Sequence, residues 1–367
     1  MQGNLRTSFN MKYIITCSIV FTLFTSLSYG QNSAKIKATR LYEDGKYKKA
    51  LRVYDSILNA NSNDTDSYYG RGLTKLALLD NDGAIKDFKK VIKLNPNDAD
   101  AYLNKGIAES KIEDGESSAL ADINHSISLR PGFSDAYNFK GNVEYAMGDT
   151  TNSMADYTKS IQLDSTNQDA FFNRAYLEMG ERKYKLAFAD FTSTLALDDR
   201  DEAAFFYRGL SLDEMKQYRD AASDYNRAIE LDPKYAEAYL NRGLDKYQLE
   251  FYQLGLQDFT EVIKLDSDNA VGYYCRALCE DKLKDYKSAV SDYSTAMLFQ
   301  ENYTEAYYGR GNAYMGEGDK EHACSDFYAA YELGYAPAKT NIDNYCKGSS
   351  KKSQKEDKPK SGFWHFQ

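Results

Sequence analysis

The chain repeats one arrangement of apolar and small residues about every 34 positions. The successive units occupy residues 31–64, 65–98, 99–133, 134–167, 168–201, 202–235, 236–269, 270–303 and 304–337. Self-similarity at a fixed period of this length is typical of repeat proteins, in which each unit is one supersecondary structure.

Each unit is predicted to contain two helices, and its positions are numbered here from 1 to 34. Positions 4, 8 and 11 share one face of a first helix, and positions 20, 24 and 27 share one face of a second. Small residues at positions 8 and 20 allow the two helix axes to approach closely. Large, mostly aromatic residues at positions 4 and 24 fill the space around that contact. Proline at position 32 ends the second helix in three units, as Pro96, Pro131 and Pro233.

This pattern resembles the tetratricopeptide repeat family, over residues 31–337. The resemblance implies an all-α fold, an α-solenoid of nine helix-turn-helix repeats that stack as a right-handed superhelix. A short helix at 338–346 is expected to cap the last repeat. The chain departs from the family at position 7, often leucine there but basic here, and at Ala34, where the first unit lacks the aromatic residue. Array ends often differ from the internal repeats in this way.

Oppositely charged residues recur at positions 7 and 23. In a hairpin that turns near position 15 these two positions lie at the same height, so a ladder of ion pairs between the two helices is predicted. The pairs with arginine are Arg71–Asp87, Arg174–Asp190, Arg208–Asp224, Arg242–Asp258, Arg276–Asp292 and Arg310–Asp326, and those with lysine are Lys105–Asp122 and Lys140–Asp156. The ladder is either a structural device that fixes the hairpin register or a charged track for a ligand; we favour the structural interpretation.

The first thirty residues have the layout of a secretory signal peptide. Lys12 precedes an uncharged apolar run, Ser28 and Gly30 are small residues before Gln31, and Met11 is a compact starting point. The sequence therefore predicts export to the periplasm or the medium, with no integral membrane segment in the mature chain. The alternative is an uncleaved signal anchor that tethers the protein to the membrane.

Composition excludes some partners and reactions. The net charge of −9, which becomes −11 without residues 1–30, disfavours a nucleic-acid partner. The three histidines, His125, His322 and His365, occupy unlike positions, so neither a metal site nor a catalytic triad is expected. We therefore expect no enzyme activity, no metal and no cofactor.

Four cysteines lie in the last quarter of the chain. Cys275 and Cys279 are spaced as core residues on one helix. Cys324 and Cys346 become neighbours if the capping helix runs antiparallel to the helix before it, and the surrounding segment resembles the end of many exported bacterial repeat proteins. A Cys324–Cys346 disulfide is therefore predicted.

In the family, positions 2, 5, 9 and 12 of the first helix point into a concave groove that holds ligands. Carried onto this chain, the apolar groove residues include Tyr69, Leu73, Leu103, Ile107, Tyr145, Phe172, Tyr176, Met179, Phe206, Tyr247, Tyr274 and Tyr308. The acidic ones include Asp66, Asp100, Asp135 and Asp169. The alternative is that position 5 packs against the neighbouring repeat and that the acids only favour helix N-termini.

These features predict a non-enzymatic scaffold in the cell envelope that binds an unidentified protein or peptide segment in its groove. A glycan-binding module that uses the groove aromatics is the alternative. The tail, residues 347–367, is predicted to be a flexible basic linker with an aromatic end around Trp364.

Overall fold

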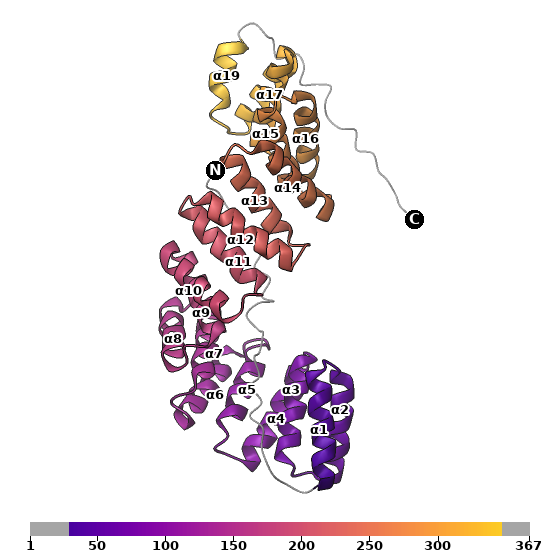
Figure 1. Cartoon of the computed structure of the whole chain (residues 1–367), viewed down its shortest axis with the longest axis vertical. Coiled ribbons are helices and arrows are strands. Elements are labelled where there is room, and N and C mark those ends of the chain that lie inside the picture. The colour runs from indigo at the N-terminus through magenta and orange to yellow at the C-terminus, as the bar shows by residue number, and fades with distance from the viewer. Residues whose placement is uncertain (1–28, 347–367) are drawn as a thin grey trace, which may run out of the picture. The chain divides into compact units, whose positions relative to one another are not determined.

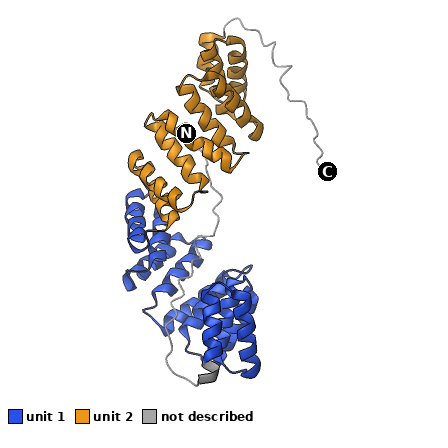
Figure 2. Cartoon of the chain, turned by 45° about the vertical axis from the view of Figure 1, so that its right-hand side comes forward, with its two compact units in different colours: residues 1–199 blue, residues 200–367 orange. Residues whose placement is uncertain are grey.

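The computed structural model describes residues 29–346, which contain nineteen α-helices and no strand (Figure 1). The helices divide into two compact units, residues 1–199 and 200–367 (Figure 2). The first unit contains α1 (Tyr29–Glu43), α2 (Tyr47–Ala60), α3 (Thr65–Ala77), α4 (Asn81–Leu94), α5 (Ala99–Glu109), α6 (Glu116–Leu129), α7 (Ser134–Ala146), α8 (Thr150–Leu163), α9 (Gln168–Gly180) and α10 (Tyr184–Leu197). The second contains α11 (Glu202–Glu214), α12 (Tyr218–Leu231), α13 (Ala236–Gln248), α14 (Tyr252–Leu265), α15 (Ala270–Lys282), α16 (Tyr286–Phe299), α17 (Thr304–Glu317), α18 (Lys320–Glu332) and α19 (Ala338–Tyr345).

Helices α1 to α18 pair as nine hairpins, one for each predicted repeat. Within each unit, the second helix of a hairpin also packs against the first helix of the next. First helices of neighbouring repeats contact one another as well, for example α7 with α9 and α13 with α15. In each unit the first helices of the hairpins, which are the odd-numbered helices from α1 to α17, therefore form a layer of their own, called here the first-helix layer. The all-α solenoid organisation is as predicted.

Close packing inside a hairpin depends on the small residue at position 8. A Cβ atom added to Gly72 would lie 2.8 Å from the ring of Phe88, and one added to Gly243 would lie 2.7 Å from the ring of Phe259. Both rings are fully buried. The large residue at position 24 thus occupies the space that the small residue leaves, as the sequence pattern predicts.

Aspartate and asparagine cap many first helices. Asp64 accepts a hydrogen bond from the backbone N–H of Ser67 at 2.9 Å, and Asp201 accepts one from Ala204 at 2.8 Å. Such caps satisfy backbone donors that the first turn of a helix leaves unpaired. Such capping residues therefore mark where α3, α5, α9, α11 and α15 begin.

The last hairpin is covered by α19, as predicted. Cys324 on α18 is bonded to Cys346 directly after α19, with the two Cα atoms 5.6 Å apart. Ile342 packs with Phe327 in the same buried cluster. The disulfide therefore attaches the capping helix to the core of the final repeat.

The predicted signal segment lies almost wholly outside the described residues, and so does the tail 347–367. Helix α1 begins at Tyr29, two residues before the predicted boundary of the first repeat. Within residues 29–346, no helix combines the length and apolar character that a membrane span requires.

Candidate functional site

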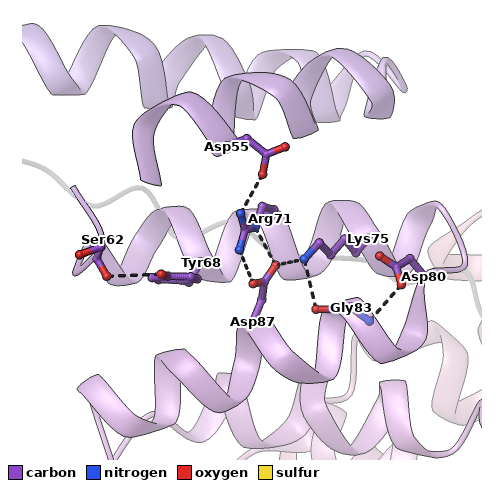
Figure 3. A network of polar contacts seen from close by, with 8 residues as sticks. All are labelled: Asp55, Ser62, Tyr68, Arg71, Lys75, Asp80, Gly83 and Asp87. Carbon is purple, nitrogen blue, oxygen red and sulfur yellow. Dashed lines mark hydrogen bonds and ion pairs between the residues drawn. The ribbon is translucent and has the colours of Figure 1, made fainter. Parts of the chain in front are cut away.

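The predicted ladder of ion pairs is present between the two helices of each hairpin from the second repeat to the ninth. In Figure 3, Arg71 donates from Nε and Nη2 to the two carboxylate oxygens of Asp87, at 2.9 and 2.7 Å. This bidentate geometry suits the planar guanidinium group. The same two-point contact recurs at all six arginine pairs.

Several arginines also reach the preceding repeat. The remaining guanidinium nitrogen of Arg71 donates to Asp55 at 2.7 Å, and that of Arg242 donates to Asn226 at 2.6 Å. Arg174 and Arg310 make the same contact with Thr158 and Ser294. All four acceptors stand at position 25 of the repeat before. The hairpin pattern alone does not predict this link, although a polar residue at position 25 in these repeats was a usable signal.

Burial favours the structural interpretation of the ladder. Asp87 is 3 % exposed and Asp258 is also 3 % exposed, and each accepts from two basic side chains. Hydrogen bonds to Asp87 raise the pKa of Arg71, which therefore stays charged. The carboxylates are thus saturated inside the hairpin and do not face a ligand.

Six of the residues assigned to the groove are buried instead, and the prediction is corrected for them. They are Leu73, Leu103, Ile107, Phe172, Phe206 and Tyr274, all at most 9 % exposed. The rings of Phe172 and Phe191 lie 5.4 Å apart, and position 5 meets position 24 of its own hairpin in the same way in other repeats. The core of the hairpin therefore extends to position 5 or position 9 at these six residues, which leaves their side chains little surface for a partner.

The other groove residues remain partly exposed on the first-helix layer. They are Tyr69, Tyr145, Tyr176, Met179, Tyr247 and Tyr308. Tyr145 on α7 and Tyr176 on α9 come from neighbouring repeats, and their rings meet edge to face with centroids 6.4 Å apart. A partner that lies along this layer would therefore meet aromatic rings from successive repeats.

The acids at position 2 are engaged with other residues of the chain. Lys35 forms an ion pair with Asp66 at 3.0 Å, and Arg130 forms one with Asp100. Asn167 donates to Asp135 at 3.1 Å. Burial, with a smaller contribution from the charge of Asp164, raises the pKa of Asp135. Asp169 is partly exposed. Asp66, Asp100 and Asp135 therefore do not form a freely available acidic edge.

Side-chain amides link neighbouring first helices in the first unit. Asn173 on α9 donates to Asn138 and Asn142 on α7, at 3.0 and 3.1 Å, and the hydroxyl of Tyr157 donates to Asn142 at 2.7 Å. Asn104 donates to the hydroxyl of Tyr69 at 2.9 Å. The contacts of Asn173 link α7 to α9 within one helical turn of Tyr145, because Asn142 and Tyr145 are three residues apart on α7. The sequence pattern did not predict a role for these asparagines.

A pair of carboxyl groups meets in the second unit. Asp245 on α13 is 2 % exposed, and burial together with the neighbouring Asp213 on α11 raises its pKa to about 10. Tyr225 donates its hydroxyl hydrogen bond to Asp213. Two like charges this close cannot both be ionised cheaply, so the pair shares a proton. Asp245 stands at position 10 of its repeat. The residue at this position is buried in all the repeats from the second to the ninth, so an aspartate there was the signal that could have indicated an unusual carboxyl group.

Cys275 and Cys279 are buried and unbridged, and burial raises the pKa of each thiol to about 12. Thiols in such an environment are poor nucleophiles and poor metal ligands. Within the described part of the chain, no three ionisable side chains of the metal-binding types come together.

Two family models match the chain. The model described as TPR repeat matches residues 80–111 and 209–249, and the model described as tetratricopeptide repeat matches residues 134–167 and 304–333. No curated protein sequence matches.

Several solved structures are similar to the chain. A tetratricopeptide repeat protein from Parabacteroides merdae is 20% identical, with a TM-score of 0.46, and the match covers 71% of this chain and 97% of that one. PilF of Pseudomonas aeruginosa is 20% identical, with a TM-score of 0.49 and coverage of 58% and 98%. YrrB, described as a TPR protein with an unusual peptide-binding site, is 24% identical, with a TM-score of 0.46 and coverage of 50% and 95%.

The matched repeats and the nine hairpins in register define an all-α repeat protein. The chain therefore contains tetratricopeptide repeats.

Proposed function

We propose that this chain is a non-catalytic scaffold in the cell envelope and that it binds a protein or peptide segment on its first-helix layer. The observation that carries the proposal is the pair Tyr145 and Tyr176, two partly exposed rings that meet across neighbouring repeats. Tyrosine offers a large contact area at low conformational cost, which binding surfaces favour.

A rigid layer supports this interpretation. The amide contacts join α7 to α9, the two helices that carry these rings, so a partner would not have to order that surface on binding. Pre-organisation of this kind increases affinity because less conformational entropy is lost.

The envelope location is supported by two independent features. The first thirty residues have the layout of a signal peptide. The Cys324–Cys346 disulfide is also a type of bond that persists mainly in oxidising compartments.

The proposal is tested by isolating binding partners from envelope extract with the intact protein and with the variant Tyr145→Ala, Tyr176→Ala, Tyr247→Ala. These three rings are partly exposed, so the variant is expected to keep its helix content. Tyr331→Ala is the matched control, because this tyrosine is 44% exposed on α18, a second helix. A partner that binds the wild type and the control but not the triple variant supports the first-helix layer.

A partner that binds all three proteins equally would refute that location. Binding of a glycan with no protein partner, lost in the triple variant and insensitive to salt, would instead identify the alternative function.

A further inference from the structure

Position 11 of the first helix sets the charge beside each ion pair. This residue lies one helical turn after the basic residue at position 7, on the side that faces the second helix. In four repeats it is a glutamate: Glu109, Glu144, Glu178 and Glu280. In the second and seventh repeats it is Lys75 and Lys246, and in the sixth and ninth it is Leu212 and Tyr314. The glutamate repeats therefore place two acids beside one base, whereas the lysine repeats place two bases beside one acid.

The four glutamates are buried. Their exposed fractions are 6, 6, 7 and 9 % in chain order, and the Oε2 atom of each is buried without a hydrogen-bond partner among the described residues. An unpaired charged oxygen in such a position is costly. The other oxygen is engaged in two of the repeats, where Lys105 contacts Glu109 at 2.8 Å and Lys140 contacts Glu144 at 3.3 Å.

Each glutamate faces the aspartate of the ion pair on the second helix of its hairpin. The charged neighbours of Glu109 are Asp122 and Lys105, and those of Glu144 are Asp156 and Lys140. Those of Glu178 are Asp190, Arg174, Lys183 and Glu181, and those of Glu280 are Asp292, Arg276 and Asp285. In all four repeats the acidic neighbour on the facing helix is the aspartate that already holds the basic residue.

A single proton on the glutamate would remove the excess negative charge and would also give the unpaired Oε2 atom a hydrogen bond to make. A protonated glutamate is neutral and can donate its O–H to the aspartate, so that a hydrogen bond between two carboxyl groups joins the helices. We propose that each of these four glutamates holds a proton in the folded chain, and that its release at rising pH loosens these four hairpins while the hairpin of the second repeat, which carries Lys75, stays unchanged.

The direction of the pH effect follows from linkage. Burial, together with the facing aspartate, raises the pKa of Glu144 and of Glu178 to about 7 and that of Glu280 to about 8, and it raises the pKa of Glu109. The unfolded chain releases the same protons near about pH 4.3. Between these values the folded state binds more protons than the unfolded state, so the stability that these glutamates contribute falls as the pH rises and becomes level above about pH 8.

The test compares the wild-type protein with the variant Glu109→Gln, Glu144→Gln, Glu178→Gln, Glu280→Gln. Glutamine has the shape of the protonated acid and can donate from its amide to the aspartate. The matched control replaces four exposed glutamates by glutamine, and these are Glu113, Glu214, Glu250 and Glu317. Melting temperature is measured from pH 5 to pH 9. Hydrogen exchange, corrected for its intrinsic pH dependence, reports the opening of each hairpin.

The expected result is a melting temperature that falls with pH in the wild type and in the control but falls less steeply in the four-glutamine variant, where Asp245 still contributes to the slope. Exchange at pH 8.5 should rise in α5–α10 and in α15–α16 relative to pH 6, but not in α3–α4, where position 11 is Lys75. A wild-type melting temperature that does not fall, or a four-glutamine variant with the wild-type slope, would overturn the proposal. A four-glutamine variant that does not fold at pH 5 would overturn it too, since the wild-type side chains are then proposed to be neutral.

Discussion

Replacing Asp87 by alanine should destabilise the second repeat strongly. Asp87 is 3 % exposed and accepts from Arg71 at 2.9 and 2.7 Å and from Lys75 at 2.7 Å (Figure 3). Its removal leaves two cations side by side inside the hairpin. Removing one partner of a buried ion pair costs about 3–5 kcal/mol, because the remaining charge is uncompensated. We expect a loss in this range for the local opening of α3 and α4.

Asp55→Ala is the matched control for this change. Asp55 accepts from the same Arg71 at 2.7 Å, but its side chain is 48% exposed. An exposed ion pair is worth about 0.2–1 kcal/mol, so the control should lose no more than that. The contrast between the two variants separates burial from the mere presence of an ion pair.

Native-state hydrogen exchange is the suitable assay, because repeats open locally and a single unfolding midpoint would average over the array. The free energy of opening is read from the amides of α3 and α4 in each variant. A loss below about 1 kcal/mol for Asp87→Ala, or losses of equal size in the two variants, would refute the reasoning that the ladder is structural.

Three further predictions concern the packing, the disulfide and the shared proton. Gly243→Val should cost about 1–3 kcal/mol through overpacking against Phe259, with alanine costing less, and urea denaturation measures this. Cys324→Ser should release the capping helix, because the bond to Cys346 closes a separation of 22 residues worth about 3 kcal/mol in the entropy model; faster hydrogen exchange in α19 alone checks this. Wild-type stability should fall between about pH 4 and about pH 10 through Asp245, whose raised folded pKa keeps a proton that the unfolded chain has released, and in Asp245→Asn this part of the slope in melting temperature should vanish.

The helices and the ladder could be predicted because both depend on spacing along the chain. A small residue at position 8 and a large one at position 24 specify which faces of two helices meet. Once the hairpin is known, Arg71 and Asp87 must lie at the same height. The family resemblance added the order in which the hairpins stack.

The burial of the groove residues could not be read from the same pattern. Whether Phe206 faces a partner or the core depends on how far the ring of Tyr225 extends across its hairpin, and the rings lie 5.7 Å apart. A helical period gives the direction of a side chain on its own helix but not the thickness of the layer beneath it. Three rings chosen as exposed, Phe172, Phe206 and Tyr274, were therefore placed wrongly.

The contacts between repeats were missed for a related reason. The reach of Arg242 to Asn226 depends on the distance from one hairpin to the next, which the repeat length does not specify. The pairing of Asp213 with Asp245 also joins two first helices of neighbouring repeats. Asp245 nevertheless stands at a position that is buried in the neighbouring repeats, and this acid could have indicated the carboxyl pair from the sequence.

The most direct test of the proposed function is site-specific photo-crosslinking in envelope preparations. A photoreactive residue is placed at Tyr145, at Tyr176 or, as the control, at Tyr331. The account predicts that Tyr145 and Tyr176 crosslink to the same protein segment and that Tyr331 does not. Crosslinks that form only at Tyr331, or equally at all three positions, would contradict binding on the first-helix layer.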